Sequence, residues 1–199
     1  MALKIILCLI FGYLFGSLNF AIIYSKLKGD DIRNHGSGNA GATNVLRTYG
    51  KGPAAVVFLL DILKGVIAVI IARLILNDAI YECSAALGAV LGHNFPVYYK
   101  FKGGKGFLVC LSTMYVIDWR VGLIATGIMI ILLLITKYMS LSTTLAMLLC
   151  PILLIPFGAS VPVILMALAC TVFMAVRHKE NFKRLIQGKE SKFTLKSKK

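Results

Sequence analysis

The sequence is poor in charged residues, and above all in acidic ones. Only 8 of its 199 residues are Asp or Glu, against 22 Lys and Arg, and charged residues make up 15% of the chain. Soluble domains carry about 25% charged residues, so this composition argues against a soluble protein. It also argues against a two-metal phosphatase, because such a site needs several carboxylates to hold its ions.

Cysteine and histidine are also scarce, and neither is spaced as metal ligands usually are. The histidines His35, His93 and His178 lie far apart, and no two cysteines have the spacing of a metal-binding motif. The sequence therefore predicts neither a metal site nor a cofactor. We expect the five cysteines to be small buried hydrophobic residues, since all lie in or beside apolar runs: Cys8, Cys83, Cys110, Cys150 and Cys170.

The sequence is instead rich in long apolar runs. Hydrophobic residues make up 58% of the chain, and its mean hydropathy is +0.83. A membrane-spanning helix needs about 20 mostly apolar residues. These runs predict an all-α integral membrane protein with about seven transmembrane helices, although five or six full spans with re-entrant segments also fit. The candidate runs are residues 3–25, 53–76, 83–99, 106–117, 121–136, 140–156 and 160–176.

The ends of two runs carry further information. The first run lacks a small-residue cleavage signature, so we interpret it as a retained span and not as a signal peptide. Pro151, Pro156 and Pro162 are expected to mark the turn between the last two runs, because proline interrupts a helix.

Basic residues gather between alternate runs. Lys and Arg concentrate in residues 26–52, in residues 100–105, at Lys137 and from residue 177 onward. If all seven runs cross the membrane, these islands share one side, which the positive-inside rule identifies as the cytoplasm. We therefore expect the N-terminus outside, the C-terminus in the cytoplasm, and the polar loops at the cytoplasmic face.

The charge pattern also suggests the domain organisation and the partners. We expect residues 1–190 to form one polytopic domain and residues 191–199 a basic cytoplasmic tail. A net charge of +14 would indicate nucleic acid in a soluble protein, but here the membrane explains it. Each basic residue of this tail that lies near anionic lipid headgroups would contribute about 1 kcal/mol to membrane binding. Membrane lipids, and no nucleic acid, are the expected partners.

Residues 33–47 form the first unusual polar island. The segment Gly36–Gly41 matches G-x-G-x-x-G, but a dinucleotide site requires a preceding β-strand, and a predicted spanning helix precedes it here. Such segments can expose successive backbone N–H groups to an anion. An ordinary flexible loop explains the segment about equally well. The candidate anion-binding residues are Gly36, Ser37, Gly38, Asn39, Gly41, Thr43, Asn44 and Arg47.

The second island, Phe101–Gly106, is rich in glycine and lysine. It is not a Walker A loop, because no Ser or Thr follows Lys105 and the glycine spacing differs. Gly103 and Gly104 would allow a backbone to approach an oxyanion closely, and Lys105 would supply a point charge. A plain positive-inside loop is the alternative interpretation.

The third island follows the last apolar run. Arg177, Asn181 and Arg184 have the i, i+4 and i+7 spacing of one helix face. His178 lies beside that face. It is a candidate general base, a candidate hydrogen-bond donor to phosphate, or an interfacial side chain. Four hydroxyl residues open the sixth run and either cap that helix or offer hydroxyls to phosphate: Ser140, Ser142, Thr143 and Thr144.

One charged pair lies inside an apolar run. Asp61 and Lys64 are i, i+3 neighbours, so they can pair on one face of a helix. Charges within a span are costly and usually functional, while a structural pair is the alternative. Taken with the three islands, the residues indicate a metal-free phosphate site on one membrane face, around four cations: Arg47, Lys105, Arg177 and Arg184.

In their order along nearly the whole chain, these motifs resemble the bacterial acyl-phosphate-dependent glycerol-3-phosphate acyltransferases. Phe107-Leu108 departs from the small apolar residues usual in that family, which bears on local packing. The matching residues are Gly16-Ser17 with Asn19; Gly36 to Asn39 with Gly41, Thr43, Asn44 and Arg47; Asp61 with Lys64-Gly65; Gly92-His93 with Phe95-Pro96; Phe101 to Gly106; Ser140 to Ser142; and Arg177-His178 with Asn181, Arg184-Leu185, Gly188 and Glu190.

The resemblance implies a multi-pass protein of the bacterial cell (inner) membrane that transfers an acyl chain from acyl phosphate to the 1-hydroxyl of glycerol 3-phosphate. The products would be 1-acylglycerol 3-phosphate and phosphate. It places Ser37, Lys105 and His178 in catalysis and the other candidates in substrate binding. The His and Asp pair, four residues apart, of other acyltransferases is absent, since Asn39, Val97 and Phe182 occupy those positions.

An anion transporter or channel is the alternative function. Such a pathway needs polar residues across both halves of the membrane, whereas the polar residues here gather on one side. The sequence leaves the oligomeric state open, and a monomer is compatible with it.

Overall fold

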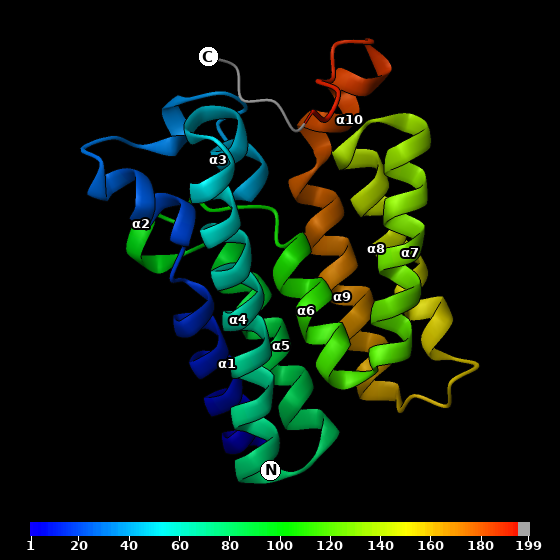
Figure 1. Ribbon diagram of the computed structural model, residues 1–199. Helices are drawn as coiled ribbons and strands as arrows, with labels where there is room; N and C mark the ends of the chain where they lie inside the picture. Colours follow the sequence, from blue (N-terminus) through cyan, green and yellow to red (C-terminus); the bar gives the residue numbers. More distant parts are fainter. Residues whose placement is uncertain (195–199) are drawn as a thin grey trace.

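The computed structural model describes residues 1–194, and throughout this part of the chain the regular elements are helices (Figure 1). Of the predicted basic tail, residues 195–199 lie outside the described residues, while the Phe193 N–H donates to the Lys137 carbonyl. The elements are α1 Ala2–Gly16, α2 Phe20–Leu27, η1 Ile32–Asn34, α3 Ala42–Tyr49, α4 Lys51–Leu76, α5 Ala79–Asn94, η2 Val97–Tyr99, α6 Phe107–Ile117, α7 Trp119–Thr136, α8 Met139–Leu154, α9 Val161–Arg177 and α10 Lys179–Ile186.

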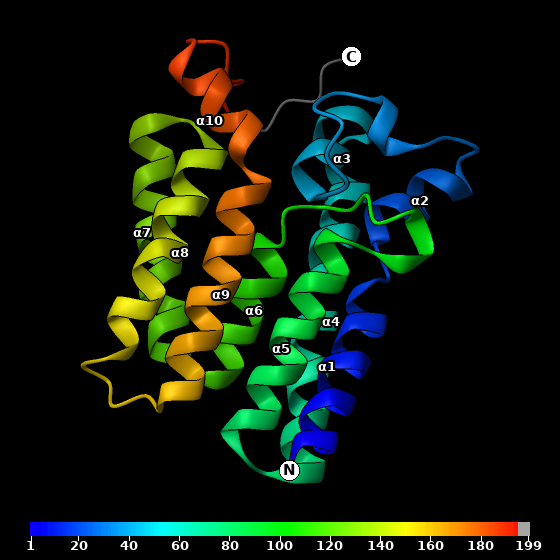
Figure 2. The same ribbon diagram turned by 180° about the vertical axis from the view of Figure 1, so that it is seen from behind.

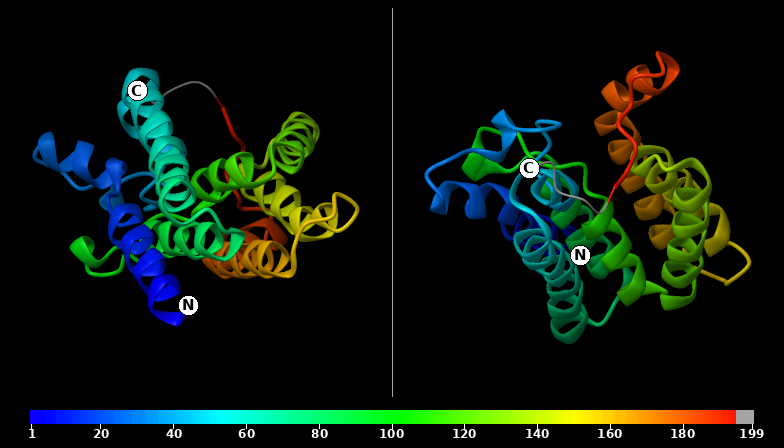
Figure 3. Two further views of the ribbon diagram at one scale, coloured as in Figure 1. Left: turned by 90° about the horizontal axis from the view of Figure 1, so that it is seen from below. Right: turned by 45° about the horizontal axis from the view of Figure 1, so that its top comes forward.

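The helices α1 and α4 to α9 run alternately up and down between two ends of a bundle (Figures 1 and 2). The N-terminus and the short links after α4, α6 and α8 lie at one end. The other end carries α2, α3, the segment between α5 and α6, and α10. Seen along the bundle, α6 lies between a group formed by α1, α4 and α5 and a group formed by α7, α8 and α9 (Figure 3). The polar islands therefore share one end.

The outer surface of the bundle is apolar. Residues 2–27, α4 and α7 are long and apolar enough to cross a membrane, whereas α9 meets the same criterion only when it is counted together with α10, to which it is bent by 54°. Large side chains such as Leu123, Ile131 and Leu134 on α7 stand exposed on the outside. In water so much exposed apolar surface would promote aggregation, whereas lipid tails solvate it. All five cysteines are free and buried, as predicted.

Two details of the predicted runs are wrong. The first run is not one helix, because the chain breaks between α1 and α2 at Ser17–Asn19. There the Ser17 hydroxyl donates to the Tyr13 carbonyl (2.7 Å), and the Asn19 side chain caps α2 by accepting the Ile22 N–H (3.1 Å).

The prolines differ from expectation as well. Pro151 lies inside α8, which continues to Leu154, and Pro162 lies in the first turn of α9, where a missing N–H costs little. Only Pro156 falls in the turn between the two helices.

Helices α1 and α5 are in contact through glycine. A Cβ atom on Gly12 or Gly16 of α1 would collide with the backbone of α5, and one on Gly88 or Gly92 of α5 would collide with the backbone of α1. Each pair has the small-xxx-small spacing that lets two helix backbones approach closely in membranes. This contact positions the end of α5. The chain leaves the bundle there and leads into the second island, Phe101–Gly106, which is called the glycine-rich segment below.

Replacing Gly88 by Val should destabilise the protein, because the new side chain meets backbone atoms that cannot move aside. Overpacking of this kind costs about 1–3 kcal/mol. Gly127→Val is the matched control, since a Cβ on Gly127 meets nothing within 4 Å. The measurement is the melting temperature of both variants in detergent. Equal melting temperatures would contradict the close α1–α5 contact.

Candidate active site

A hydrogen-bonded chain at the polar end joins three segments that are distant in sequence. Lys105 donates its ammonium to the side-chain carbonyl of Asn181, and the Asn181 amide donates to the Glu190 carboxylate (2.6 Å). Arg184 and Ser140 also donate to this carboxylate, at 2.9 and 2.8 Å. The glycine-rich segment, α10 and the start of α8 are thus joined at one carboxylate. Ser140 and Glu190 belong to the motifs that carry the family resemblance, but neither was assigned to catalysis or substrate binding; the available signal for Glu190 was an acidic residue in a region rich in Lys and Arg.

The charges around Lys105 show which cations gather there. Burial lowers the pKa of Lys105, the charge of Glu190 opposes that effect, and the positive charges of Arg184, Arg177 and Arg47 add to it, so that the pKa is about 8. The site therefore gathers four cations from the glycine-rich segment, α3, α9 and α10. Such a cluster fits a phosphate group, which would supply the missing negative charge.

The Glu190 carboxylate remains ionised among these cations. Burial raises its pKa, but hydrogen bonds from Asn181, Ser140 and Arg184 outweigh that effect and leave the pKa lowered. An ionised Glu190 accepts all three hydrogen bonds and so orients Asn181 toward Lys105.

His178 lies at the corner between α9 and α10, beyond the apolar part of α9. Its Nδ1 lies 2.8 Å from the Met174 carbonyl. A carbonyl only accepts, so Nδ1 carries the hydrogen and Nε2 is left as an acceptor. Burial and the Lys105 charge lower the pKa of His178 to about 4, so the ring is neutral at pH 7. It is therefore available to accept a hydrogen bond from a hydroxyl.

Two glycines of the second island pack closely against the end of α5. The Gly103 N–H donates to the Asn94 carbonyl (3.2 Å) and the Gly104 N–H to the His93 carbonyl (3.0 Å). A Cβ on Gly103 would meet the His93 carbonyl, and one on Gly104 would meet the His93 ring. Both amides are therefore occupied, and the structure gives these glycines a packing role beside Lys105.

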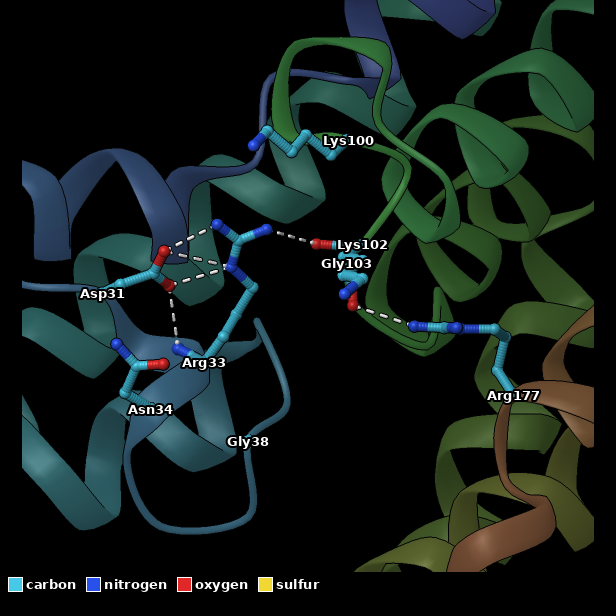
Figure 4. Close-up of a pocket in the computed structure, with 8 residues that line it drawn as sticks. All are labelled: Asp31, Arg33, Asn34, Gly38, Lys100, Lys102, Gly103 and Arg177. Atoms are coloured by element: carbon cyan, nitrogen blue, oxygen red, sulfur yellow. Dashed lines mark hydrogen bonds and ion pairs between the residues drawn. The ribbon is translucent and has the colours of Figure 1, made fainter.

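Two arginines hold the same segment through its carbonyls. Arg177 donates to the Gly104 and Gly103 carbonyls (3.1 and 3.0 Å), and Arg33 to those of Tyr99 and Lys102 (3.0 and 3.3 Å). Between them lies an open cleft of about 540 Å³ (Figure 4). The cleft is lined by Asp31, Arg33, Asn34, Gly38, Lys100, Lys102, Gly103 and Arg177.

Arg177 has different partners from the other members of its predicted helix face. The chain bends by 54° between α9 and α10; Asn181 and Arg184 bind Glu190, and Asn181 also accepts from Lys105, while Arg177 binds the carbonyls of Gly103 and Gly104. The bend was not predicted, because the spacing alone fits a straight helix.

The first island is held closed by Asn44. Its side chain accepts the Ser37 N–H (2.9 Å) and donates to the Ile32 and His35 carbonyls (3.1 and 2.9 Å). Gly36 sits at φ +56° against this side chain, where a Cβ would collide with it. Asn44 thus uses its donors and its acceptor within the chain and shapes the loop.

The segment that follows keeps free donors. Within residues 1–194, the backbone N–H groups of Asn39, Ala40, Ala42 and Thr43 have no hydrogen-bond partner. Two of them belong to the start of α3, where a helix presents its unpaired N–H groups to an anion. The exposed Ser37 hydroxyl, the Asn39 side chain and the Arg47 guanidinium have no partner in this part of the chain either. Gly41 precedes the first residue of α3.

Ser142 differs from the other candidates. Its hydroxyl is fully buried and donates to the Tyr138 carbonyl (2.9 Å) within α8. No hydrogen bond joins it to another candidate residue in the described chain, and its contact with substrate stays a prediction.

The intramembrane pair forms as predicted. Lys64 Nζ lies 2.8 Å from Asp61 Oδ1, and both side chains are buried. Lys64 also contacts His93 Nδ1 and the Leu18 carbonyl, each at 2.9 Å.

Known proteins are similar to this chain in sequence and in architecture. A family model described as glycerol-3-phosphate acyltransferase matches residues 6–188. A glycerol-3-phosphate acyltransferase of Francisella tularensis subsp. novicida (strain U112) is 41% identical over 191 residues, covering 96% of this chain and 93% of the relative. One of Prochlorococcus marinus (strain NATL1A) is 40% identical over 191 residues, covering 93% of this chain and 96% of the relative.

Two crystal structures of PlsY, an integral membrane glycerol 3-phosphate acyltransferase, have the same fold. Its glycerol 3-phosphate form superposes with a TM-score of 0.91 at 38% identity, and its lysophosphatidic acid form with a TM-score of 0.88 at 37% identity. Each comparison covers 96% of this chain and 96% of the other. The chain therefore belongs to the family of integral membrane glycerol-3-phosphate acyltransferases.

Proposed function

We propose that this protein transfers an acyl chain from acyl phosphate to the 1-hydroxyl of sn-glycerol 3-phosphate. The products are 1-acyl-sn-glycerol 3-phosphate and phosphate, in phospholipid biosynthesis. The observation that carries this proposal is the gathering of Arg47, Arg177 and Arg184 around Lys105, beside a loop with unpaired amides. Two neighbouring sites for anions suit a reaction between two phosphorylated substrates. The relatives' names and the glycerol 3-phosphate form of the solved neighbour support the same reaction.

The two phosphates are assigned to different segments. The acyl-phosphate group binds the first island, where the free amides of Asn39, Ala40, Ala42 and Thr43 can replace its hydration shell. Glycerol 3-phosphate binds the cationic cluster. The donor site comprises Ser37, Gly38, Asn39, Thr43 and Ser142; the acceptor site comprises Arg47, Lys105, Arg177, His178 and Asn181.

The chemistry needs no covalent enzyme intermediate, because acyl phosphate is already an activated mixed anhydride. The 1-hydroxyl oxygen attacks the carbonyl carbon, a C–O ester bond forms, and the bond from that carbon to the phosphate oxygen breaks. The hydroxyl proton passes to His178 Nε2 or to an oxygen of the donor phosphate. The protein's task is to align the two substrates and stabilise the developing negative charge.

The membrane topology is part of the proposal. Helices α1 and α4 to α9 cross a bacterial inner membrane seven times, with the N-terminus outside and the polar end in the cytoplasm. The uneven distribution of Lys and Arg between the two ends supports this orientation. Water-soluble glycerol 3-phosphate and phosphate then exchange with the cytoplasm, while the acyl chain lies among the apolar helices and the surrounding lipid.

Orientation can be tested by introducing cysteine into sealed right-side-out vesicles. Lys102→Cys, in the exposed second island, should resist a membrane-impermeant maleimide until the vesicles are opened. Asp78→Cys, at the opposite end, should react at once. The native cysteines are all buried, so their background labelling is low. The reverse pattern would overturn the orientation.

Removing the Lys105 charge should nearly abolish acyl transfer. With purified protein in lipid, synthetic acyl phosphate and glycerol 3-phosphate, we expect Lys105→Ala to lower kcat/KM for glycerol 3-phosphate by about 100- to 1,000-fold, the usual loss for one charge-stabilising donor. Lys28→Ala is the matched control, since Lys28 is exposed beside α2 at the same end of the bundle and does not line the cleft. Acyl-coenzyme A should not replace acyl phosphate. If neither donor supports acyl transfer by intact protein, the proposed function fails.

The pH dependence should follow the lowered pKa of Lys105. Because that pKa is about 8, the charged ammonium predominates below pH 8 and is lost above it. We therefore expect kcat/KM for glycerol 3-phosphate to fall as pH rises through about 8. His178, neutral above about pH 4, should add no break between pH 7 and 9. In Lys105→Arg, whose side chain stays charged, the decline should disappear; an unchanged decline would assign it to another group.

A further inference from the structure

A cluster of ionisable side chains lies inside the bundle, away from the proposed substrates. Asp61 and Lys64 on α4 are each 1% exposed, and His93 on α5 is 4% exposed. Lys64 Nζ lies 2.8 Å from Asp61 Oδ1 and 2.9 Å from His93 Nδ1. None of the three side chains hydrogen bonds to Lys105, His178 or Asn181 in the described chain. The reaction described above does not use them.

Lys64 reaches the first island through the break between α1 and α2. Its ammonium donates to the Leu18 carbonyl (2.9 Å). The next residue, Asn19, caps α2 and donates its side-chain amide to the Ala40 carbonyl (3.2 Å). A buried charge on α4 is therefore linked, through one peptide unit, to the loop that carries the unpaired amides.

His93 reaches the second island directly. Its ring accepts the Lys64 hydrogen bond at Nδ1, and its Nε2 lies next to Gly104, where a Cβ would collide with it. Its carbonyl accepts the Gly104 N–H (3.0 Å). The Ala40 carbonyl of the first island approaches Gly104 from another direction, since it would also contact that Cβ. The two islands therefore meet at Gly104, one residue before Lys105.

A purely structural role explains the cluster poorly. The core packs α4 and α5 together by apolar residues such as Ala68, Val69, Ala86 and Val90. Burying an ion pair is costly, and replacing such a pair by apolar residues of similar size is often neutral or stabilising. A contact that served packing alone would not require three ionisable groups inside the bundle.

We propose that Asp61, Lys64 and His93 are positioning residues that fix the first island relative to the second. Lys105 then faces the acyl-phosphate site at the distance the reaction needs. Asp61 fixes the Lys64 ammonium, Lys64 holds the His93 ring and the Leu18 carbonyl, and these hold Gly104 and Ala40. The inference rests on the proposed acyl transfer and adds residues that do not touch substrate. Misplacement by about 1 Å can lower a rate about 100-fold.

The test is the double variant Asp61→Leu with Lys64→Met. It removes both charges together, so neither ion is left buried without its counter-ion. We expect kcat to fall about 10- to 100-fold, while the KM values for acyl phosphate and glycerol 3-phosphate change less than about threefold. Amide hydrogen exchange of a peptide covering residues 95–106 should become faster, because the Gly103 and Gly104 N–H groups lose their fixed acceptors. The melting temperature in detergent reports whether the variant is folded.

The matched control is Arg73→Met with Glu82→Gln. This ion pair, 2.6 Å long, also joins α4 to α5, but at the opposite end of the bundle. If joining the helices were the only role of either pair, both double variants would lose activity in proportion to stability. Positioning predicts that only the Asp61 and Lys64 variant loses kcat beyond its loss of stability.

Single variants of His93 keep the proposal testable if the double variant does not fold. Asn places a side-chain oxygen near the position of Nδ1 and can still accept from Lys64, whereas Leu cannot. We expect His93→Asn to retain at least about tenfold more kcat than His93→Leu at similar melting temperatures. Equal activities of these two variants, or full kcat in the charge-free double variant, would overturn the proposal.

Wild-type acyl transfer is measured first in each experiment. Absence of wild-type turnover would contradict the proposed function itself. Normal wild-type turnover with unaffected variants would contradict only the positioning role.

Discussion

The hydrogen bonds between the glycine-rich segment and the end of α5 place most of the site. The Gly103 and Gly104 amides bind the last carbonyls of α5, and Arg177 holds the carbonyls of the same two glycines. Hydrogen bonds fix both the N–H groups and the carbonyls of this backbone. The Lys105 side chain that follows therefore points toward Asn181. A side chain at either glycine would push the segment away from α5, because it would meet the backbone or ring of His93. The two glycines therefore determine where the Lys105 side chain lies.

In the proposed reaction, the protein itself supplies the positive charge that faces the phosphate. Lys105 is largely buried, and the arginines around it add positive charge that Glu190 balances only in part. An arriving phosphate would relieve that imbalance. Cations held in place before the substrate binds need little reorganisation during the reaction, which is how fixed charges lower a barrier.

The same physics separates the bundle into two kinds of surface. Its flanks expose large apolar side chains that lipid can solvate, and its polar end collects the groups that require water or a phosphate. Close contacts replace hydrophobic burial between helices, as in the glycine-to-backbone packing of α1 and α5. A charged pair in the middle of such a bundle is tolerated because each group has partners, and these partners lead to both loops.

Local spacing in the sequence determined the helical class, the apolar runs, the Asp61–Lys64 pair and the identity of most candidate residues, because these depend on neighbours within one or two turns. The tertiary structure decided what those residues contact. Asn44 closes its own loop, Arg177 and Asn181 bind different atoms of the glycine-rich segment, and Glu190 joins three segments. The pattern of hydrophobicity also did not predict the break at Ser17–Asn19 or the continuation of α8 past Pro151. The physical reason is the same in each case: the partner atoms lie on elements distant in the chain, and periodicity along one helix carries no information about which backbone it will meet.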